Sequence, residues 1–223
     1  MSPMPAAQPE RVATPFGPVE RDRLRRALAR GETMAFPTET SYALGGNALL
    51  EPLAAAIYRL KGRRRDQPLL LLVDGAPDVE RWAGEVPPAA RVLMERFWPG
   101  PLTLVFRAAP HLPPHLADGR GTVALRWSPH PVVAELLRIG GVPLIGTSAN
   151  RSGSPALHTA DAVRAAFPGE PLLCVDGGAT AEGPPSTVLD VTLRPFRVLR
   201  PGAIAPALLG DALRARFPEL SPA

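Results

Sequence analysis

Apolar segments of strand length alternate with segments of helical periodicity along most of this chain, and this alternation restricts its possible folds most strongly. The strand-length apolar segments are residues 33–36, 69–73, 102–106, 122–126, 143–147, 172–175, 187–191 and 197–199. Helical spacing of apolar residues predicts helices over 18–30, 51–60, 91–97, 131–139, 160–167 and about 206–217. This pattern is typical of α/β proteins with a largely parallel or mixed sheet. We therefore expect a twisted mixed sheet that is flanked by helices.

We expect one folded domain over residues 18–223, preceded by a disordered tail over residues 1–17. The tail is rich in proline and shows no apolar periodicity. A chain of 223 residues with 45% hydrophobic content suits one sizeable core and is short for two ordinary domains. The sequence shows no signal peptide and no apolar run of membrane-spanning length, so we expect a cytoplasmic protein without a membrane partner.

The sequence gives little support to metal or covalent chemistry. Cys174 is the only cysteine, which excludes an internal disulfide and a cysteine-based metal site. The four histidines are not spaced as metal ligands, and no Ser-His-Asp arrangement follows from spacing. The motifs GxxxxGK[ST], GxGxxG and GxSxG are absent. We therefore expect no dedicated metal ligands, and any bound ATP is not held by a P-loop.

Three apolar strands run directly into small polar loops. Residues 34–36 lead to 37–42, residues 143–145 lead to 146–150, and residues 173–175 lead to 176–178 and then to 183–187. Ligands of open α/β sheets bind beyond the carboxyl ends of the strands. Glycine lets the backbone approach an anion there, and hydroxyl and backbone N–H groups donate to it. Single loops of this kind are usually ordinary turns, but three of them indicate an anion or nucleotide site.

Four basic residues are candidates for binding that anion. Lys61 and Arg63 follow a helix, and Lys61 is the only lysine among 25 lysines and arginines. They form either a solvated basic turn or a phosphate clamp, in which Lys61 is a compact charge and Arg63 a bidentate fork. Arg126 and Arg200 end predicted strands and face either the crevice or solvent. The residues alone thus predict an α/β protein with an anion site at the strand ends.

Eight short motifs, in order over residues 33–204, resemble the YrdC-like family of threonylcarbamoyl-adenylate synthases. They are residues 36–42, 61–63, 97–104, 123–126, 147–153, 176–178, 186–190 and 199–202. Each motif is weak alone, whereas the K-x-R and S-x-N pair together with the others is highly specific. The resemblance implies a short form of the family, without the additional C-terminal domain of some members.

The resemblance implies a twisted α/β fold around a wide, positively charged cavity. It implies formation of threonylcarbamoyl-AMP and pyrophosphate from L-threonine, bicarbonate and ATP, as a step towards threonylcarbamoyladenosine in tRNA. Mg²⁺ on the phosphates is expected by analogy with other nucleotidyl chemistry. No dedicated cage of carboxylates is visible in the sequence, and Glu39 is the one carboxylate that could contribute. Possible partners are RNA or tRNA on a basic surface and downstream proteins that transfer the threonylcarbamoyl group.

The resemblance also implies a role for each matching residue. The residues implied for threonine binding are Thr40, Arg126 and Ser186. Those implied for ATP binding are Lys61, Arg63, Gln67, Thr122, Gly146, Ser148 and Arg200, with Gln67 where the family often has asparagine. Those implied for catalysis are Lys61, Arg63, Ser148 and Asn150.

Two positions depart from the family pattern. Leu72 occupies the place of a histidine near threonine, and Ala43 follows Tyr42 where glycine is usual. Loss of one polar contact costs about 0.5–1.5 kcal/mol. Threonine binding would then be roughly threefold to tenfold weaker.

Two alternative functions are compatible with the sequence. The first is a paralogue of the same fold that acts on another amino acid or another carbamoyl or adenylate substrate, which the Leu72 departure favours. The second is a non-catalytic RNA-binding module, which the net charge of +4 and the basic run after Lys61 favour. An aromatic content of 5% and the absence of a stacking motif argue against single-strand RNA recognition.

Overall fold

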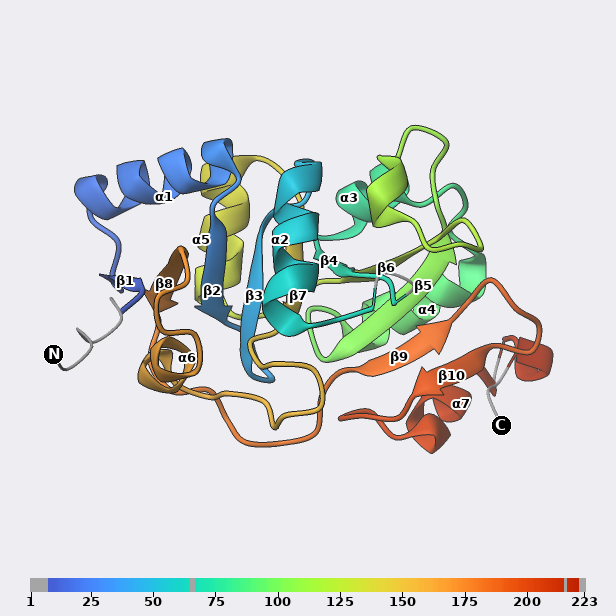
Figure 1. Ribbon diagram of the computed structural model, residues 1–223. Coiled ribbons are helices and arrows are strands. Elements are labelled where there is room, and N and C mark those ends of the chain that lie inside the picture. Colours follow the sequence, from blue (N-terminus) through green and yellow to red (C-terminus); the bar gives the residue numbers. More distant parts are fainter. Residues whose placement is uncertain (1–7, 65–66, 215, 221–223) are drawn as a thin grey trace, which may run out of the picture.

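The computed structural model describes residues 8–64, 67–214 and 216–220 (Figure 1). The strands are β1 (Glu10–Ala13), β2 (Thr33–Pro37), β3 (Tyr42–Asn47), β4 (Leu70–Leu72), β5 (Leu102–Arg107), β6 (Thr122–Arg126), β7 (Leu144–Ser148), β8 (Leu172–Asp176), β9 (Thr187–Asp190) and β10 (Arg197–Arg200). The α-helices are α1 (Pro18–Arg30), α2 (Glu51–Lys61), α3 (Ala76–Trp82), α4 (Pro88–Phe97), α5 (Pro131–Gly140), α6 (Ala160–Ala166) and α7 (Pro206–Arg214). Two short 3-10 helices, η1 (Pro114–Leu116) and η2 (Pro218–Leu220), complete the described elements.

One sheet contains all ten described strands, in the order β1-β8-β2-β3-β7-β4-β6-β5-β9-β10. Parallel pairs join β1 to β8, β8 to β2, β4 to β6 and β5 to β9, and the other neighbours are antiparallel. The expected α/β fold with a mixed sheet is therefore confirmed.

The helices cover the sheet because each has one apolar face. In α1 that face is Leu24, Ala27 and Leu28, and the helix ends at Gly31, whose φ of 67° is left-handed. Helices α1 and α5 pack together next to β2 and β3, and α4 packs against α7 near the opposite end of the sheet (Figure 1). The buried apolar residues form three clusters, one of which extends over β4, β5, β6 and the helices α2, α3, α4 and α7.

Strand β1 lies inside the segment that we expected to be a disordered tail. Residues 10–13 pair in parallel with residues 173–176 of β8, and Val12 is buried. The prediction is wrong for residues 10–13, because a four-residue edge strand has too short an apolar pattern to stand out from the sequence. Residues 1–7 of the expected tail lie outside the described residues.

Two further elements were missed by the sequence pattern. Residues 42–47, whose start we assigned to a polar loop, form β3, which pairs with β2 and β7 near the middle of the sheet. Its two glycines and its polar ends hide the apolar pattern, although the strand is almost fully buried. The second missed element is helix α3, which has only seven residues. Helix α7 ends at Arg214, before the predicted end near residue 217.

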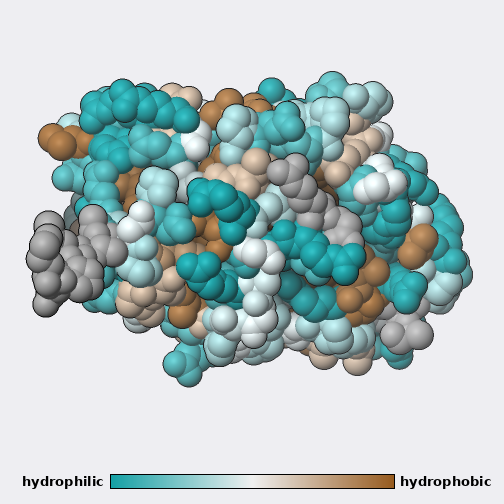
Figure 2. All heavy atoms as spheres, viewed as in Figure 1, coloured by the Kyte–Doolittle hydropathy of each residue, from teal (hydrophilic) through white to brown (hydrophobic). Residues whose placement is uncertain are grey.

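Within the described residues, no helix is long and apolar enough to cross a membrane. Figure 2 shows that hydrophilic residues cover most of one face of the molecule, with only scattered apolar residues. The large apolar side chains that are exposed are Val19, Leu193, Leu199 and Leu208.

Candidate functional site

A cavity of about 630 Å³ brings together most of the residues that the sequence singled out. Its lining includes eight of them: Thr40, Arg63, Thr122, Arg126, Gly146, Ser148, Ser186 and Arg200. They come from segments that are up to 160 residues apart in the chain, and the sheet order places those segments around one hollow. The volume lies within the range of small-molecule sites.

Several cavity residues lie at or near strand ends. Thr40 lies in the turn between β2 and β3, Arg126 ends β6, Ser148 ends β7, Ser186 directly precedes β9, and Arg200 ends β10. Strands β6 and β10 run opposite to β2 and β7, and alternate residues of β6, Thr122, Ala124 and Arg126, line the cavity. The cavity therefore extends across one face of the sheet, and the rule that ligands of open α/β sheets bind at the carboxyl ends of the strands describes only the part beside β2 and β7.

Three arginines make the cavity strongly cationic. Burial lowers the pKa of Arg126, and the Glu39 carboxylate opposes this shift. Burial also lowers the pKa of Arg63 and of Arg200, and the charges of Arg126 and Arg63 lower that of Arg200 further. Like charges crowded in a low-dielectric hollow are relieved when an anion binds between them. The cavity is thus suited to a ligand with several negative charges.

Arg200 is held by neutral oxygen atoms. Its Nη2 donates to the Ser186 carbonyl oxygen at 2.7 Å and to the Ser186 hydroxyl at 3.0 Å. The Ser186 hydroxyl also lies 2.9 Å from the Thr103 hydroxyl. These contacts fix the orientation of Arg200 without neutralising its charge.

Arg63 is held in a similar way. Its Nη2 donates to the carbonyl oxygen of Pro68 at 3.0 Å, and its Nε donates to that of Gln67 at 3.4 Å. Gln67 is exposed and is not part of the cavity lining, so its side chain is the least well placed of those expected at ATP. The backbone of this turn, rather than the Gln67 amide, is what orients Arg63.

Lys61 and Asn150, both expected at the site, are outside the cavity lining and bond to the loop that carries Ser148. The Lys61 ammonium donates to the carbonyl oxygen of Ser148. The same ammonium donates to the carbonyl oxygen of Asn150 at 2.8 Å and to Asn150 Oδ1 at 3.3 Å. The Ser148 hydroxyl donates to the same Asn150 Oδ1 at 2.5 Å. Burial, with a smaller contribution from the charge of Arg63, lowers the pKa of Lys61 to about 8. A buried ammonium therefore organises the loop that carries Ser148.

The turn between β2 and β3 is rich in hydroxyl groups and lines part of the cavity. The Thr38 hydroxyl donates to the Ser41 carbonyl oxygen at 2.8 Å and lies 3.1 Å from the Thr40 hydroxyl. Thr38 and Ser41 are buried, so this turn is rigid, and Thr40 is half-buried with its hydroxyl available at the cavity.

Glu39 is a site residue whose main contact sequence reasoning missed. We considered it only as a metal ligand, whereas its Oε1 lies 3.6 Å from the Nε of Arg126. Its Oε2 accepts a hydrogen bond from the Ser128 hydroxyl. No signal in the sequence links Glu39 to Arg126, because 87 residues separate them.

Five further cavity residues were also missed: Thr103, Asp118, Arg120, His158 and Leu199. Arg120 donates to Asp118 Oδ2 at 3.1 Å and to Asp190 Oδ2 at 2.9 Å, so a charged bridge closes one rim of the cavity. Thr103 and Leu199 lie in motifs that the resemblance contained, but neither had been given a role.

The two departures from the family pattern lie on strands beside the cavity. Ala43 lines the cavity, whereas Leu72 is fully buried and is not part of its lining. A Cβ atom on Gly146 would lie 2.6 Å from the Leu72 side chain. Leu72 thus packs over Gly146 on the same face of the sheet as the cavity and requires glycine at position 146.

No residue of this chain is assigned to Mg²⁺. Among the described residues there is no group of three or more histidine, cysteine, aspartate or glutamate side chains that could hold a metal ion. Glu39, the carboxylate that we considered for this role, is engaged by Arg126 and Ser128.

A family model described as Sua5_yciO_yrdC, telomere recombination, matches residues 26–202. The chain belongs to the Sua5/YciO/YrdC family. A threonylcarbamoyl-AMP synthase of Pyrococcus abyssi is 40% identical over 177 residues, which are 79% of this chain and 52% of that protein. One from Alkalilimnicola ehrlichii is 35% identical over 199 residues, which are 87% of this chain and 96% of that protein. The family resemblance seen in the sequence is confirmed.

The fold agrees with a solved member of the Sua5/YciO/YrdC family. The crystal structure of P. abyssi Sua5 complexed with L-threonine matches with a TM-score of 0.86 and 34% identity, over 96% of this chain and 62% of that one. This chain thus spans about half the length of the Pyrococcus synthase sequence that it matches. Residues 26–202, which the family model matches, contain all the cavity residues described above.

Proposed function

We propose that this protein is a threonylcarbamoyl-AMP synthase, which forms threonylcarbamoyl-AMP and pyrophosphate from L-threonine, bicarbonate and ATP. The observation that carries the proposal is the convergence of Arg63, Arg126 and Arg200 in one cavity with the hydroxyls of Thr40 and Ser186. Relatives named for this activity share 35–40% identity with the chain. One solved relative of the same fold was crystallised with L-threonine.

The cavity offers different chemistry at its two ends. Near the turn between β2 and β3, Thr40 and Arg126 present a hydroxyl and a guanidinium, which suit the hydroxyl and carboxylate of threonine. Arg63 and Arg200 have no carboxylate partner among the described residues, so their charges are free for the phosphates of ATP. We assign Thr122, Gly146, Ser148 and Gln67 to the ATP side and Ser186 to threonine.

The proposed reaction has two steps. In the first, the ammonium of threonine releases a proton to solvent, the neutral amine attacks the carbon of bicarbonate, a C–N bond forms, and water leaves to give an N-carboxylate. In the second, an oxygen of that carboxylate attacks the α-phosphorus of ATP, a P–O bond forms, and the bond to the β-phosphate breaks to release pyrophosphate.

The cavity promotes these steps mainly by charge and position. All the reactants are anions or become anionic, and they repel one another in water. Arg63, Arg126 and Arg200 offset that repulsion and hold the reacting groups together. Lys61 and Asn150 contribute by shaping the loop that presents Ser148.

A direct test uses the purified protein with ATP, Mg²⁺, bicarbonate and L-threonine. We expect pyrophosphate release that depends on threonine and bicarbonate, and a mixed anhydride of the mass of threonylcarbamoyl-AMP. Pyrophosphate release with a different amino acid would support a paralogue with another substrate. Salt-sensitive RNA binding without ATP turnover would support the RNA-binding alternative.

Several expectations about the cell remain proposals. We propose that the product passes to proteins that transfer the threonylcarbamoyl group, since a carboxylic–phosphoric anhydride is reactive and must be consumed by a nucleophile. Contact with tRNA through the basic surface and a cytoplasmic location remain predictions. Mg²⁺ is expected to be carried by the ATP phosphates rather than by a cluster of side chains.

A further inference from the structure

Arg126 differs from Arg63 and Arg200 in having a carboxylate beside it. Glu39 Oε1 lies 3.6 Å from Arg126 Nε, whereas Arg63 and Arg200 bond to backbone carbonyl oxygens and a hydroxyl. Among these three arginines, Arg126 is therefore the one whose charge is compensated; the fourth cavity arginine, Arg120, is paired with Asp118 and Asp190. The part of the cavity beside Arg126 is close to electrically neutral, whereas the part beside Arg63 and Arg200 is positive.

The pair between Glu39 and Arg126 is buried but incompletely bonded. Arg126 is 4% exposed, and the Glu39 side chain is 15% exposed. Neither Glu39 Oε1 nor Arg126 Nε has a hydrogen-bond partner. Buried charges normally satisfy their remaining hydrogen-bonding groups, so a pair left in this state calls for an explanation.

The carboxylate of Glu39 is held in place from its other side. The Ser128 hydroxyl donates to Glu39 Oε2, and the backbone N–H of His130 donates to that hydroxyl at 3.3 Å. Ser128 and His130 precede α5, and Glu39 belongs to the turn after β2. Glu39 is thus anchored between two parts of the fold and faces the Nε side of Arg126, while Arg126 also lines the cavity.

The charge of this pair matches one kind of ligand. A guanidinium and a carboxylate together carry no net charge, and neither does the zwitterion of an α-amino acid. The amino-acid carboxylate pairs with the guanidinium, and its ammonium is favoured by the negative charge of the glutamate close behind. A carboxylate without an ammonium gains the first attraction but meets the repulsion of the glutamate.

We propose that Glu39 determines specificity at the amino-acid end of the cavity, by fixing the guanidinium of Arg126 and cancelling its charge so that a zwitterionic α-amino acid is selected over a simple carboxylate. This inference rests on the proposed function in assigning that end to an amino acid. Glu39 Oε1 is shielded from solvent, so Glu39 acts through Arg126 and through its charge rather than by direct contact. Glu39 is therefore a positioning residue.

The test compares two ligands that differ only in the ammonium group, L-threonine and 3-hydroxybutyrate. Their dissociation constants are measured by calorimetry for the wild-type protein and for Glu39→Gln. We expect wild type to prefer L-threonine, and Glu39→Gln to bind it roughly tenfold more weakly or worse. We expect 3-hydroxybutyrate to bind Glu39→Gln as tightly as wild type or more tightly, because the repulsion is removed.

Glu135→Gln is the matched control. Glu135 is also a largely buried carboxylate whose Oε1 has no hydrogen bond but pairs with an arginine, Arg21, at 3.2 Å, and it is outside the cavity lining. Its substitution should leave both dissociation constants unchanged. Ser128→Ala keeps the charge of Glu39 but removes its anchor, so we expect weaker threonine binding with the preference for the zwitterion retained.

Three outcomes would overturn the inference. In the first, wild type binds the two ligands equally tightly. In the second, Glu39→Gln loses affinity for both ligands to the same extent. In the third, Glu39→Gln changes neither dissociation constant. If Glu39→Gln does not fold, Ser128→Ala decides. The inference then fails if Ser128→Ala binds threonine as tightly as wild type, or if it no longer prefers threonine to 3-hydroxybutyrate. Because these are binding measurements, a protein that selects threonine but forms no product would refute the proposed synthase activity and leave this inference intact.

Discussion

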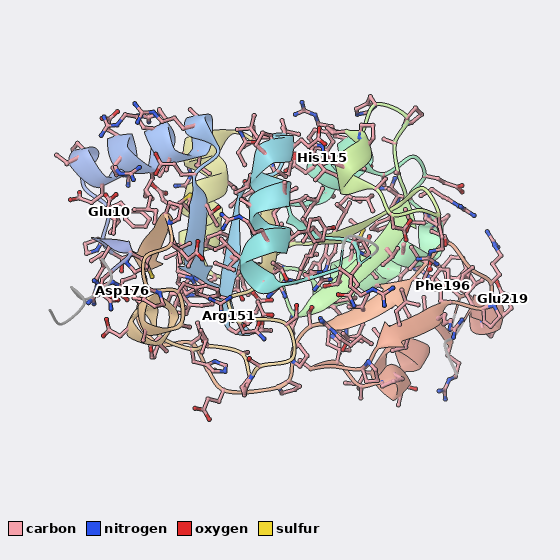
Figure 3. The ribbon with its side chains drawn as sticks, viewed as in Figure 1. Glu10, His115, Arg151, Asp176, Phe196 and Glu219 are labelled. Carbon is pink, nitrogen blue, oxygen red and sulfur yellow. The ribbon has the colours of Figure 1, made fainter. Side chains whose placement is uncertain are left out.

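The Lys61 ammonium donates to the Asn150 carbonyl oxygen at 2.8 Å and so connects the end of α2 to a loop 89 residues further along the chain. The backbone repeats the link in the opposite direction, since the N–H of Ser152 donates to the carbonyl oxygen of Lys61 at 2.8 Å. Figure 3 shows the neighbouring Arg151 at the lower edge of β3 and β7, next to this loop. The only lysine of the chain therefore fixes the shape of a cavity wall.

We predict that Lys61→Ala lowers pyrophosphate release by orders of magnitude and leaves the fold intact. The carbonyl oxygens of Ser148 and Asn150 lose their buried donor, which costs about 1–3 kcal/mol per unsatisfied group. Lys61→Arg should also be impaired, because a planar fork cannot direct its donors to three converging oxygens as an ammonium does. Circular dichroism checks the fold, and full activity of Lys61→Arg would refute the importance of the ammonium shape.

ATP binding is predicted to take up protons near pH 8–9. The pKa of Lys61 is lowered to about 8 by burial and by the charge of Arg63, so this amine is partly neutral in that range. A polyanion next to Arg63 cancels the repulsion and raises the pKa, and the amine then binds a proton. Below about pH 7 the amine is already protonated, and the uptake should vanish.

Calorimetry in two buffers of different ionisation enthalpy measures this proton uptake. Lys61→Arg is the control, because arginine stays protonated throughout the range. Equal uptake in wild type and Lys61→Arg would assign the proton to another group.

Arg126→Ala and Arg200→Ala are predicted to weaken the binding of different substrates. Loss of a hydrogen bond to a charged group costs about 1.5–3 kcal/mol, which is roughly tenfold to a hundredfold in affinity. We expect Arg126→Ala to raise the KM for threonine and Arg200→Ala to raise the KM for ATP. Steady-state kinetics with each substrate varied in turn would show the split, and equal effects on both substrates would contradict the division of the cavity.

Gly146→Ala is predicted to destabilise the protein and distort the cavity. Its Cβ would lie 2.6 Å from Leu72 Cδ1 and 2.8 Å from Leu72 Cγ, and Leu72 is fully buried. Overpacking of this kind costs about 1–3 kcal/mol. Chemical denaturation measures the loss, and Leu72→Ala in the same chain should recover part of it. Additive effects of the two substitutions would exclude the clash as the cause.

The sequence by itself determined those features that depend on local pattern. The helix over Pro18–Arg30 follows from apolar spacing and a terminal glycine, and it was predicted with the same bounds that the structure has. The polar loops after β2, β7 and β8 likewise indicated part of the cavity, since Thr40, Ser148 and Ser186 line it. The resemblance supplied the identities of the residues at that site, because short motifs in a fixed order need no knowledge of distances.

Tertiary structure alone decided which side chains act on one another. Glycines concealed β3 from the pattern, and the edge strand β1 forms only because β8 provides a parallel partner. The contacts of Glu39 with Arg126 and of Lys61 with Asn150 join residues more than 80 positions apart. Periodicity reports which face of an element is buried, whereas charge pairing and burial depend on which elements the sheet order makes neighbours. For that reason the roles of Glu39 and Lys61 could be assigned only from the folded protein.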